Sequence, residues 1–544
     1  MADQTRFVRS PWARTAAAAA LFIGLTLANT WPLATAPGSR VGQHGDAFFS
    51  VWRLGWVAHQ LRTDPVHLFD ANIFYPERRT LAYSDAMLLP ATVLAPVHWM
   101  GARPLVIYNV VLLSAFVLNG FAAYLLVYRL VGSYAAGLLG GVVFAFAPYR
   151  FDHFDHLEMQ FSFWMPLAVL AWHNAVERLR VRDCLLVAIL TSGQILSCIY
   201  YAVFLMTWFG VVTLFWFWRT PTRAVKTLTY MLMPAVVVFA LYSLPYLGNR
   251  DRLGERRAGE VASWSPQLND FASSPPTNLL YGWTSELGGP ERYLFPGLVA
   301  LGLLVASVWP PLDRRRAVHA IGVVTAFLLV LGSNGPVYEL LYEWVLPYRG
   351  LRVPARANIL ILVGLAVLAG YGLDRLLKRL RPRAAALAAA LALGTASAEY
   401  LSAPGLQRVD ERVSEFYPLL RDMPDAVLFE WPVTVPWRIW NMVDVTYMYR
   451  STLHWRPMLN GYSGFYPDSY MKLLVRMRPF PDSSSIRYLQ RLGATVLVIH
   501  ELPQRPKLYE EAIERLGRDP KIEPIVSGRD SGLRITFFRL APPR

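Results

Sequence analysis

Apolar runs separated by short polar links fill residues 13–401 of the chain. A helix needs about 20 mainly apolar residues to cross a lipid bilayer, and the runs are close to that length. They therefore predict a mainly α-helical, polytopic membrane protein with about eleven transmembrane helices. We place these helices near residues 13–36, 106–129, 134–149, 161–177, 183–200, 201–218, 225–247, 293–311, 317–333, 356–376 and 384–401.

After residue 401 the apolar runs shorten and their period changes. Short buried strands are predicted at 426–430 and 494–499, because each is a brief apolar run bounded by polar residues. Helices at 486–492 and 509–516 and a hairpin around 528–532 complete the pattern. We therefore expect a transmembrane domain at 1–401, which includes a first external loop at 37–103, and a small α/β domain at 402–544.

Composition supports a membrane protein, since 54% of the residues are hydrophobic and only 17% are charged. The net charge of +15 comes largely from Arg and Lys in the links between apolar runs. Threading the runs alternately puts these links on one side, which is then cytoplasmic. We therefore predict a plasma-membrane protein with a cytoplasmic N-terminus and an extracytoplasmic tail, and no nucleic-acid partner.

The segment from Gly42 to Asp85 follows the first apolar run and is rich in acids, histidine and aromatic residues. We expect it to be a loop. Asp46 lies close to the predicted membrane surface, where its carboxylate could accept a proton from an acceptor hydroxyl. His44 is a candidate substrate-binding residue beside it. The other acids of this segment are expected to be solvated or to cap helices.

A second polar segment, residues 148–160, carries three acids and two imidazoles between two predicted helices. If it is helical, residues three and four apart lie on one face and could meet over one substrate. The candidates are Asp152, His153, Asp155, His156 and Glu158. A divalent metal is an open alternative, although no recognised zinc spacing is present; we favour no cofactor. A polar interfacial turn without a catalytic role is the other alternative.

A third segment is basic on the side that should be poor in Arg. Arg349, Arg352 and Arg356 stand at the entrance to a predicted helix. The guanidinium fork binds phosphate oxygens in pairs, so a phosphate is a good reason for this placement. Snorkelling to the headgroups of membrane lipids is the alternative.

Carboxylates, imidazoles and arginines on one external face suit transfer of a sugar from a lipid phosphate. The cations would stabilise the departing phosphate while a carboxylate activates the acceptor. A nucleotide-sugar donor is less favoured, because the sequence contains no Gly-rich phosphate loop. A transporter or lipid flippase with an external regulatory domain is one alternative, but it predicts ionisable residues inside the helices. A non-catalytic envelope assembly protein is another.

Five short motifs are spread over these external segments. They are Gly45-Asp46, Phe74-Tyr75-Pro76, Pro148-Tyr149-Arg150 followed by His153 and His156, Arg352-Val353-Pro354-Ala355-Arg356, and Leu459-Asn460-Gly461-Tyr462-Ser463-Gly464. With these motifs the chain resembles the GT-C superfamily of membrane glycosyltransferases, which includes protein O-mannosyltransferases and lipid A aminoarabinose transferases. It also resembles bacterial YfhO-like membrane proteins.

The resemblance implies a GT-C fold and inverting transfer of a sugar from a polyprenyl-phosphate donor to an extracytoplasmic glycan, lipid or protein. It also implies that a carboxylate of the first external loop is the base, which corresponds to Asp46, and that Asp152 or Asp155 supplies a second acidic motif. The first loop lacks a paired Asp-x-Asp, which argues against metal dependence. We expect Asp46, the 152–158 segment and the arginines to share one external cavity. Residues 460–465 are expected either to recognise the acceptor or to form an ordinary Gly-containing turn.

Overall fold

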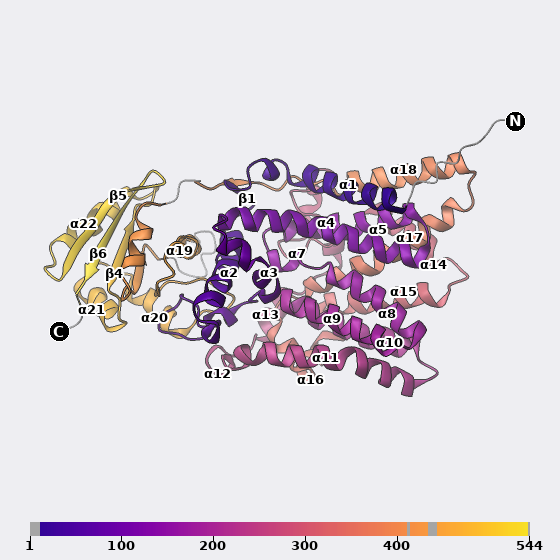
Figure 1. The fold of residues 1–544 in the computed structure, drawn as a ribbon, viewed down its shortest axis with the longest axis horizontal. Helices are drawn as coiled ribbons and strands as arrows, with labels where there is room; N and C mark the ends of the chain where they lie inside the picture. Colours follow the sequence, from indigo (N-terminus) through magenta and orange to yellow (C-terminus); the bar gives the residue numbers. More distant parts are fainter. Residues whose placement is uncertain (1–10, 411–413, 434–442, 542–544) are drawn as a thin grey trace. The chain divides into compact units, whose positions relative to one another are not determined.

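The computed structural model describes residues 11–410, 414–433 and 443–541 (Figure 1). The chain forms two compact units. The first comprises Met1–Ala36, Asn109–Tyr242 and Glu255–Gly405. The second comprises Pro37–Tyr108, Ser243–Gly254 and Leu406–Arg544, and so groups the first external segment with the tail. The boundary expected at residue 401 stays a prediction.

A helix lies at every predicted span. The long helices of the first unit are α1 (Pro11–Thr30), α4 (Pro104–Val131), α5 (Tyr134–Phe146), α8 (Trp164–Arg178), α9 (Val181–Ser197), α10 (Ile199–Trp216), α11 (Pro221–Leu247), α14 (Leu298–Val308), α15 (Arg314–Val330), α17 (Asn358–Leu377) and α18 (Pro382–Glu399). Short helices α6 (Tyr149–Asp152), α7 (Leu157–Gln160), α13 (Ala258–Ser263) and α16 (Tyr338–Trp344) lie in its loops.

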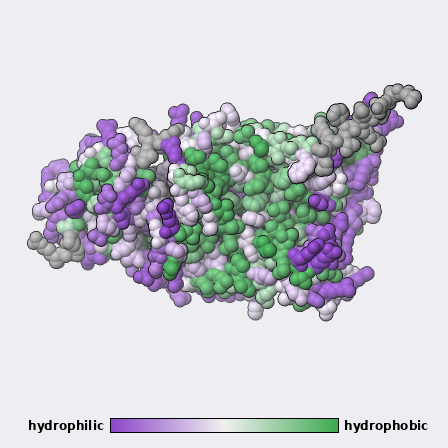
Figure 2. All heavy atoms as spheres, viewed as in Figure 1, coloured by the Kyte–Doolittle hydropathy of each residue, from purple (hydrophilic) through white to green (hydrophobic). Residues whose placement is uncertain are grey.

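Five of the helical stretches in the described residues are long and apolar enough to cross a membrane. They are Pro104–Val131, Tyr134–Asp152, Ile199–Trp216, Pro221–Leu247 and Pro354–Leu377. The polytopic, mainly α-helical architecture is therefore confirmed, whereas the count of eleven spans stays a prediction. Apolar side chains predominate in the middle of the face of this helical unit that Figure 2 shows, and hydrophilic side chains gather at its right-hand end, as expected for a surface that crosses lipid.

Helix α17 forms the centre of the first unit and is buried along most of its length. It packs against α5, α14 and α15. Gly372 allows its close approach to α14, because a Cβ at this position would lie 2.0 Å from the Leu303 carbonyl oxygen. Small residues serve this purpose where membrane helices pack without a hydrophobic driving force.

The second unit overturns one expectation, since the first external segment is not a loop throughout. Residues His44–Thr63 form the 20-residue helix α2, which is buried on nearly all sides and packs against α3 (Leu88–Trp99) and α19 (Val443–Ser451). A helix buried on all sides carries no single apolar stripe. The pattern of apolar residues therefore does not reveal α2, and the polar residues of its first turn suggest a loop instead.

The tail forms the predicted sheet. Strands β3 (Leu428–Trp431) and β4 (Val496–His500) are parallel, while β6 (Leu533–Leu540) is antiparallel to both β4 and β5 (Ile522–Asp530). Ser531 and Gly532 both have positive φ, as a tight hairpin turn requires. Helices α20 (Asp468–Arg476), α21 (Ser483–Arg491) and α22 (Pro506–Gly517) accompany the sheet, and β1 (Arg40–Val41) pairs with β2 (Gln407–Arg408). Helix α12 (Arg250–Leu253) also belongs to this unit. The predicted strands, helices and hairpin are confirmed.

Candidate functional site

Asp46 lies in the first turn of α2, in the second unit. The N-cap residue Gln43 makes no side-chain hydrogen bond to the helix, and a carboxylate in the first turn is stabilised by the positive end of the helix dipole. The Tyr462 hydroxyl donates a hydrogen bond of 3.4 Å to Asp46 Oδ1. The fold thus holds a partly exposed carboxylate at a helix start, beside a tyrosine of the tail.

His44 is fixed at the same end of α2. Its ring stacks on Phe48 at 4.8 Å, and Phe48 stacks on Tyr449 at 4.4 Å. Burial lowers the pKa of His44, and the hydrogen bond with the Arg408 carbonyl opposes part of this shift. The Nε2–H of the neutral ring donates to Arg408 O over 3.1 Å. Its substrate-binding role stays a prediction, while its contacts join α2 to β2.

Three of the five motifs meet in this second unit. The Phe74 N–H donates to Asn460 O over 3.0 Å, and a Cβ on Gly461 would lie 2.7 Å from the Phe74 ring. The Tyr462 ring meets Phe49 edge-on at 5.3 Å. The segments Gly45-Asp46, Phe74-Tyr75-Pro76 and Leu459–Gly464 therefore pack against one another, although they are far apart in the sequence.

The other two motifs meet in the first unit. The 148–160 segment is not one helix, because α6 ends at Asp152 and α7 begins at Leu157. Buried Arg150 holds the turn between them, donating to Met159 O at 3.2 Å and to Ser162 Oγ at 2.8 Å. The helical spacing assumed from the sequence is wrong, but the rings of His153 and His156 still meet edge-on at 5.6 Å.

Glu291 joins these imidazoles to Arg356. Arg356 Nε donates to Glu291 Oε2 over 2.9 Å, and its Nη2 pairs with Oε1. Glu291 Oε2 also lies 3.6 Å from His153 Nδ1, and Oε1 lies 3.8 Å from His156 Nε2. The side chains of Glu291 and Arg356 are only 13% and 8% exposed. Arg356 was expected to face a phosphate, but its fork is taken up by a carboxylate.

The electrostatics of this cluster follow from burial and from Arg356. Burial alone would raise the pKa of Glu291, but the Arg356 guanidinium outweighs it and holds the pKa well below its usual value. Burial lowers the pKa of His153 to about 3. At neutral pH Glu291 is therefore ionised and His153 is uncharged, so Arg356 supplies the charge that keeps the carboxylate ionised.

The remaining candidates of the 148–160 segment are Asp152, Asp155 and Glu158. Asp152 Oδ2 is 3.9 Å from His153 Nε2, and Asp155 and Glu158 are both buried. In the described ranges, no group of three or more His, Cys, Asp or Glu side chains is arranged to hold a metal ion. Catalytic roles for Asp152 and Asp155 stay predictions.

Arg349 and Arg352 are more accessible than Arg356, each with 35% of its side chain exposed. Arg352 Nη1 lies 3.7 Å from Glu260 Oε1, and its backbone N–H donates to the Tyr200 hydroxyl. Arg349 donates to the backbone carbonyls of Tyr342 and Glu343. Of the three predicted phosphate ligands, Arg352 has the weakest side-chain contact among those described, and the phosphate-binding role of all three stays a prediction. The cavity predicted to unite Asp46 with these residues stays a prediction.

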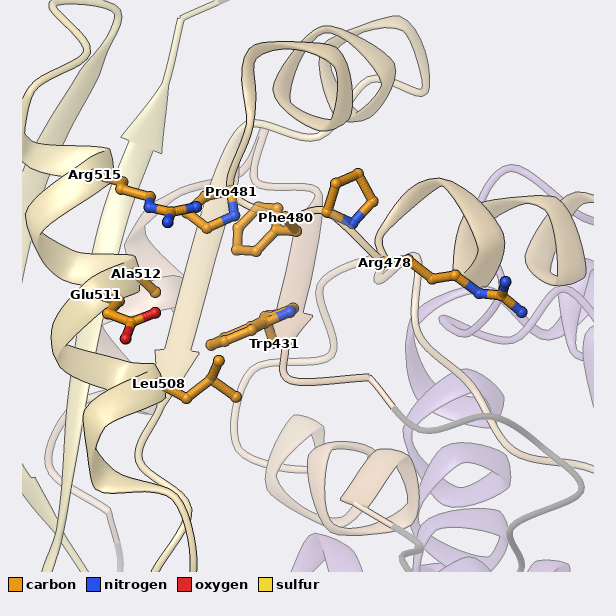
Figure 3. Close-up of a pocket in the computed structure, with 9 residues that line it drawn as sticks. Trp431, Arg478, Phe480, Pro481, Leu508, Glu511, Ala512 and Arg515 are labelled. Atoms are coloured by element: carbon orange, nitrogen blue, oxygen red, sulfur yellow. The ribbon is translucent and has the colours of Figure 1, made fainter.

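A pocket of about 200 Å³ lies in the tail, between α22 and the loop that precedes α21 (Figure 3). The rings of Trp431 and Phe480 point toward each other in it, 5.4 Å apart, while the side chain of Arg478 points away from α22. No predicted site residue lines this pocket.

Comparison with solved structures defines the class of the fold. The chain is similar to the arabinofuranosyltransferase AftD from Mycobacteria, with a TM-score of 0.57 and 14% identity over 97% of this chain. The match covers 40% of the AftD chain. The predicted GT-C fold of polytopic membrane proteins is thereby confirmed.

Residues 49–335 match a family described as a domain of unknown function, DUF6311. This match spans more than half of the 544 residues. The chain belongs to the DUF6311 family. No curated protein matches it.

Proposed function

We propose that this protein is a membrane glycosyltransferase that moves a sugar from a polyprenyl-phosphate donor to an extracytoplasmic acceptor. The observation that carries the proposal is the GT-C fold, combined with a carboxylate in the first turn of the helix that follows the first apolar run. The acceptor is a glycan, a lipid or a protein. The protein lies in the plasma membrane with its N-terminus in the cytoplasm and its tail outside.

Asp46 acts as the general base. Its carboxylate takes the proton of the acceptor hydroxyl as that oxygen attacks the anomeric carbon of the sugar. The bond from the anomeric carbon to the phosphate oxygen breaks at the same time, and its electron pair leaves with the polyprenyl phosphate. Attack from the side opposite the leaving group inverts the anomeric configuration. Tyr462 holds the carboxylate in position through its hydroxyl.

The first unit binds the donor. Arg349, Arg352 and Arg356 stabilise the negative charge that develops on the departing phosphate. The partial exposure of Arg349 and Arg352 leaves guanidinium surface for a ligand. Asp152, Asp155 and Glu158 orient the hydroxyls of the donor or acceptor, as carboxylates accept such hydrogen bonds. In the second unit, His44 and residues 460–465 contact the acceptor.

Replacing Asp46 by Asn tests the proposal. Removing the base should lower the rate of sugar transfer by about 10² to 10⁴, while expression and the melting temperature stay close to those of the wild type. Asp64→Asn is the matched control, since Asp64 is the C-cap of the same helix and pairs with exposed His67. Full activity in the Asp46 variant, or an equal loss in both variants, would overturn the role of Asp46.

A further inference from the structure

Glu291 lies in a nest of four side-chain nitrogen atoms, and its two oxygens hydrogen-bond with only two of them. Its two oxygens face four nitrogens: Nε and Nη2 of Arg356, Nδ1 of His153 and Nε2 of His156. Only the two arginine contacts are hydrogen bonds. The imidazole nitrogens remain at 3.6 and 3.8 Å, which is beyond the usual hydrogen-bond range.

The ring of His153 has hydrogen-bonding capacity that this nest does not use. Its side chain is 2% exposed, and neither of its ring nitrogens has a hydrogen-bond partner in the described part of the chain. Asp152 Oδ2 lies on the other side of the ring, 3.9 Å from Nε2. A buried polar group without a partner is costly, so a ring held in this way indicates a site that is completed by something else.

The backbone of Glu291 is also strained. Its φ of +68° lies in the left-handed region, which non-glycine residues seldom adopt. Strain of this kind persists only where the surrounding structure imposes it, and it gathers at ligand sites and switches. The carboxylate is thus held in the nest against the preference of its own backbone.

We infer that Glu291 is an internal stand-in for phosphate, and that the phosphate of a lipid-linked ligand displaces it from Arg356, His153 and His156. The inference rests on the proposed function and names the group that the first unit binds. The polyprenyl phosphate that leaves the donor is a monoester with three free oxygens, enough to reach the guanidinium fork and both imidazoles, and arginine binds phosphate in pairs as it binds carboxylate. Displacement releases Glu291 and its strained backbone from the nest.

Glu291→Gln in the full-length protein tests the inference. Gln keeps the shape of Glu but cannot neutralise Arg356, so the free protein should melt at a lower temperature. Decaprenyl phosphate should bind the variant about tenfold more tightly than the wild type, because no internal anion competes for the nest. It should also restore the melting temperature. Glu286→Gln is the matched control, since Glu286 is an exposed acid of the same segment; it should bind like the wild type.

Two further arms identify the source of the phosphate. Inorganic phosphate and phosphatidic acid are titrated in parallel, and a gain confined to decaprenyl phosphate supports the lipid-linked ligand. A gain confined to inorganic phosphate or to phosphatidic acid would overturn that ligand. His156→Asn, at a side chain that is 24% exposed, should weaken decaprenyl phosphate binding in both the wild-type and the Glu291→Gln backgrounds.

The outcomes separate the inference from the proposed function. Equal or weaker binding by Glu291→Gln, when the wild type binds, would overturn the inference alone and leave Glu291 a structural ion-pair partner. If neither protein binds decaprenyl phosphate, the inference and the proposed donor class both fail. Sugar transfer that depends on Asp46, with no change of binding in Glu291→Gln, would leave the proposed function standing without the inference.

Discussion

Each compact unit buries a cluster that combines a carboxylate with histidine and arginine, and the two clusters differ in how closely their imidazoles approach the carboxylate. In the second unit, Glu430 of β3 meets Tyr417 and His500 of β4, and Arg450 meets His500. In the first unit, Glu291 meets His153, His156 and Arg356. Comparing them distinguishes a cluster that supports the fold from one that suits ligand exchange.

The Glu430 cluster has short contacts through one carboxylate oxygen, Oε2, whereas Oε1 is buried without a hydrogen-bond partner among the described residues. Arg450 Nη1 donates to His500 Nδ1 over 3.2 Å, which assigns the ring proton to Nε2. That Nε2–H donates to Glu430 Oε2 at 2.7 Å, the Tyr417 hydroxyl donates to the same oxygen at 2.5 Å, and Arg450 pairs with Asp530 at 2.9 Å. A buried polar network connected in this way makes a core rigid.

This network also supports the start of α2 within its own unit. The Glu430 N–H donates to Asn460 Oδ1 over 2.7 Å, and Asn460 precedes the Gly461-Tyr462 pair that reaches Asp46. The Glu291 cluster, by contrast, has long imidazole contacts and a strained backbone. Short imidazole contacts therefore accompany the network of the second unit, and long ones accompany the strained carboxylate of the first.

The largest expected effect separates the two carboxylates by rescue. Glu430→Gln and Glu291→Gln should each cost about 3 kcal/mol of unfolding free energy, because each leaves buried partners unsatisfied. Decaprenyl phosphate should restore the stability of the Glu291 variant and leave the Glu430 variant unchanged. Hydrogen exchange of β3 and of the 148–160 segment measures both. Rescue of both variants, or of neither, would break the comparison.

The second-largest expected effect is a loss of stability of the second unit in acid. Burial lowers the pKa of His454 to about 4 and lowers that of His500, against which the Glu430 hydrogen bond acts. The unfolded chain, with a His pKa of about 6.5, then binds more protons than the folded protein. Stability contributed by His454 is therefore complete above about pH 6.5 and is lost on acidification toward pH 4, at about 1 kcal/mol per pH unit.

Hydrogen exchange of β3 and β4, corrected for intrinsic rates at each pH, follows this loss. His454→Asn removes one titrating group, and its pH dependence should be shallower than that of the wild type by about 1 kcal/mol per pH unit. An identical slope in the two proteins would contradict the assignment to His454.

The smallest effect tests the link from the network to Asp46. Gly461→Ala places a Cβ 2.7 Å from the Phe74 ring, and such overpacking should cost about 1 to 3 kcal/mol. Sugar transfer should also fall, because the neighbouring Tyr462 hydroxyl shifts away from Asp46. Gly517→Ala, at a position where a Cβ meets nothing within 4 Å, is the control. Equal activity in the two variants would show that Tyr462 does not position Asp46.

The sequence predicted much of this architecture, because long apolar runs and short strands have periods that single segments reveal. Helix α2 was not predicted, because a helix buried on all sides shows no single apolar stripe and because its first turn is polar. The motifs were found, but their grouping was not: Asp46 pairs with Tyr462, and Glu291 links His153 to Arg356, through contacts that local spacing does not encode.

Glu291 was missed for the same reason. It lies 65 residues from Arg356 and is one of several acids in its loop, so only the preceding Gly288-Gly289-Pro290 turn hinted at an unusual backbone. The hydrogen-bonded pair of His173 and His319, 2.9 Å apart across 146 residues, shows the same limit. Single-segment patterns find elements, whereas clusters assembled from distant segments need the fold.

Incubating the purified, full-length protein with a panel of labelled polyprenyl-phosphate sugars and, in parallel, with the matching nucleotide sugars tests the central claim most directly. The account predicts transfer or hydrolysis of at least one lipid-linked sugar, release of polyprenyl phosphate, inverted anomeric configuration in the product, and loss of turnover in Asp46→Asn. Turnover of nucleotide sugars alone, or a product that retains the configuration of the donor, would contradict it.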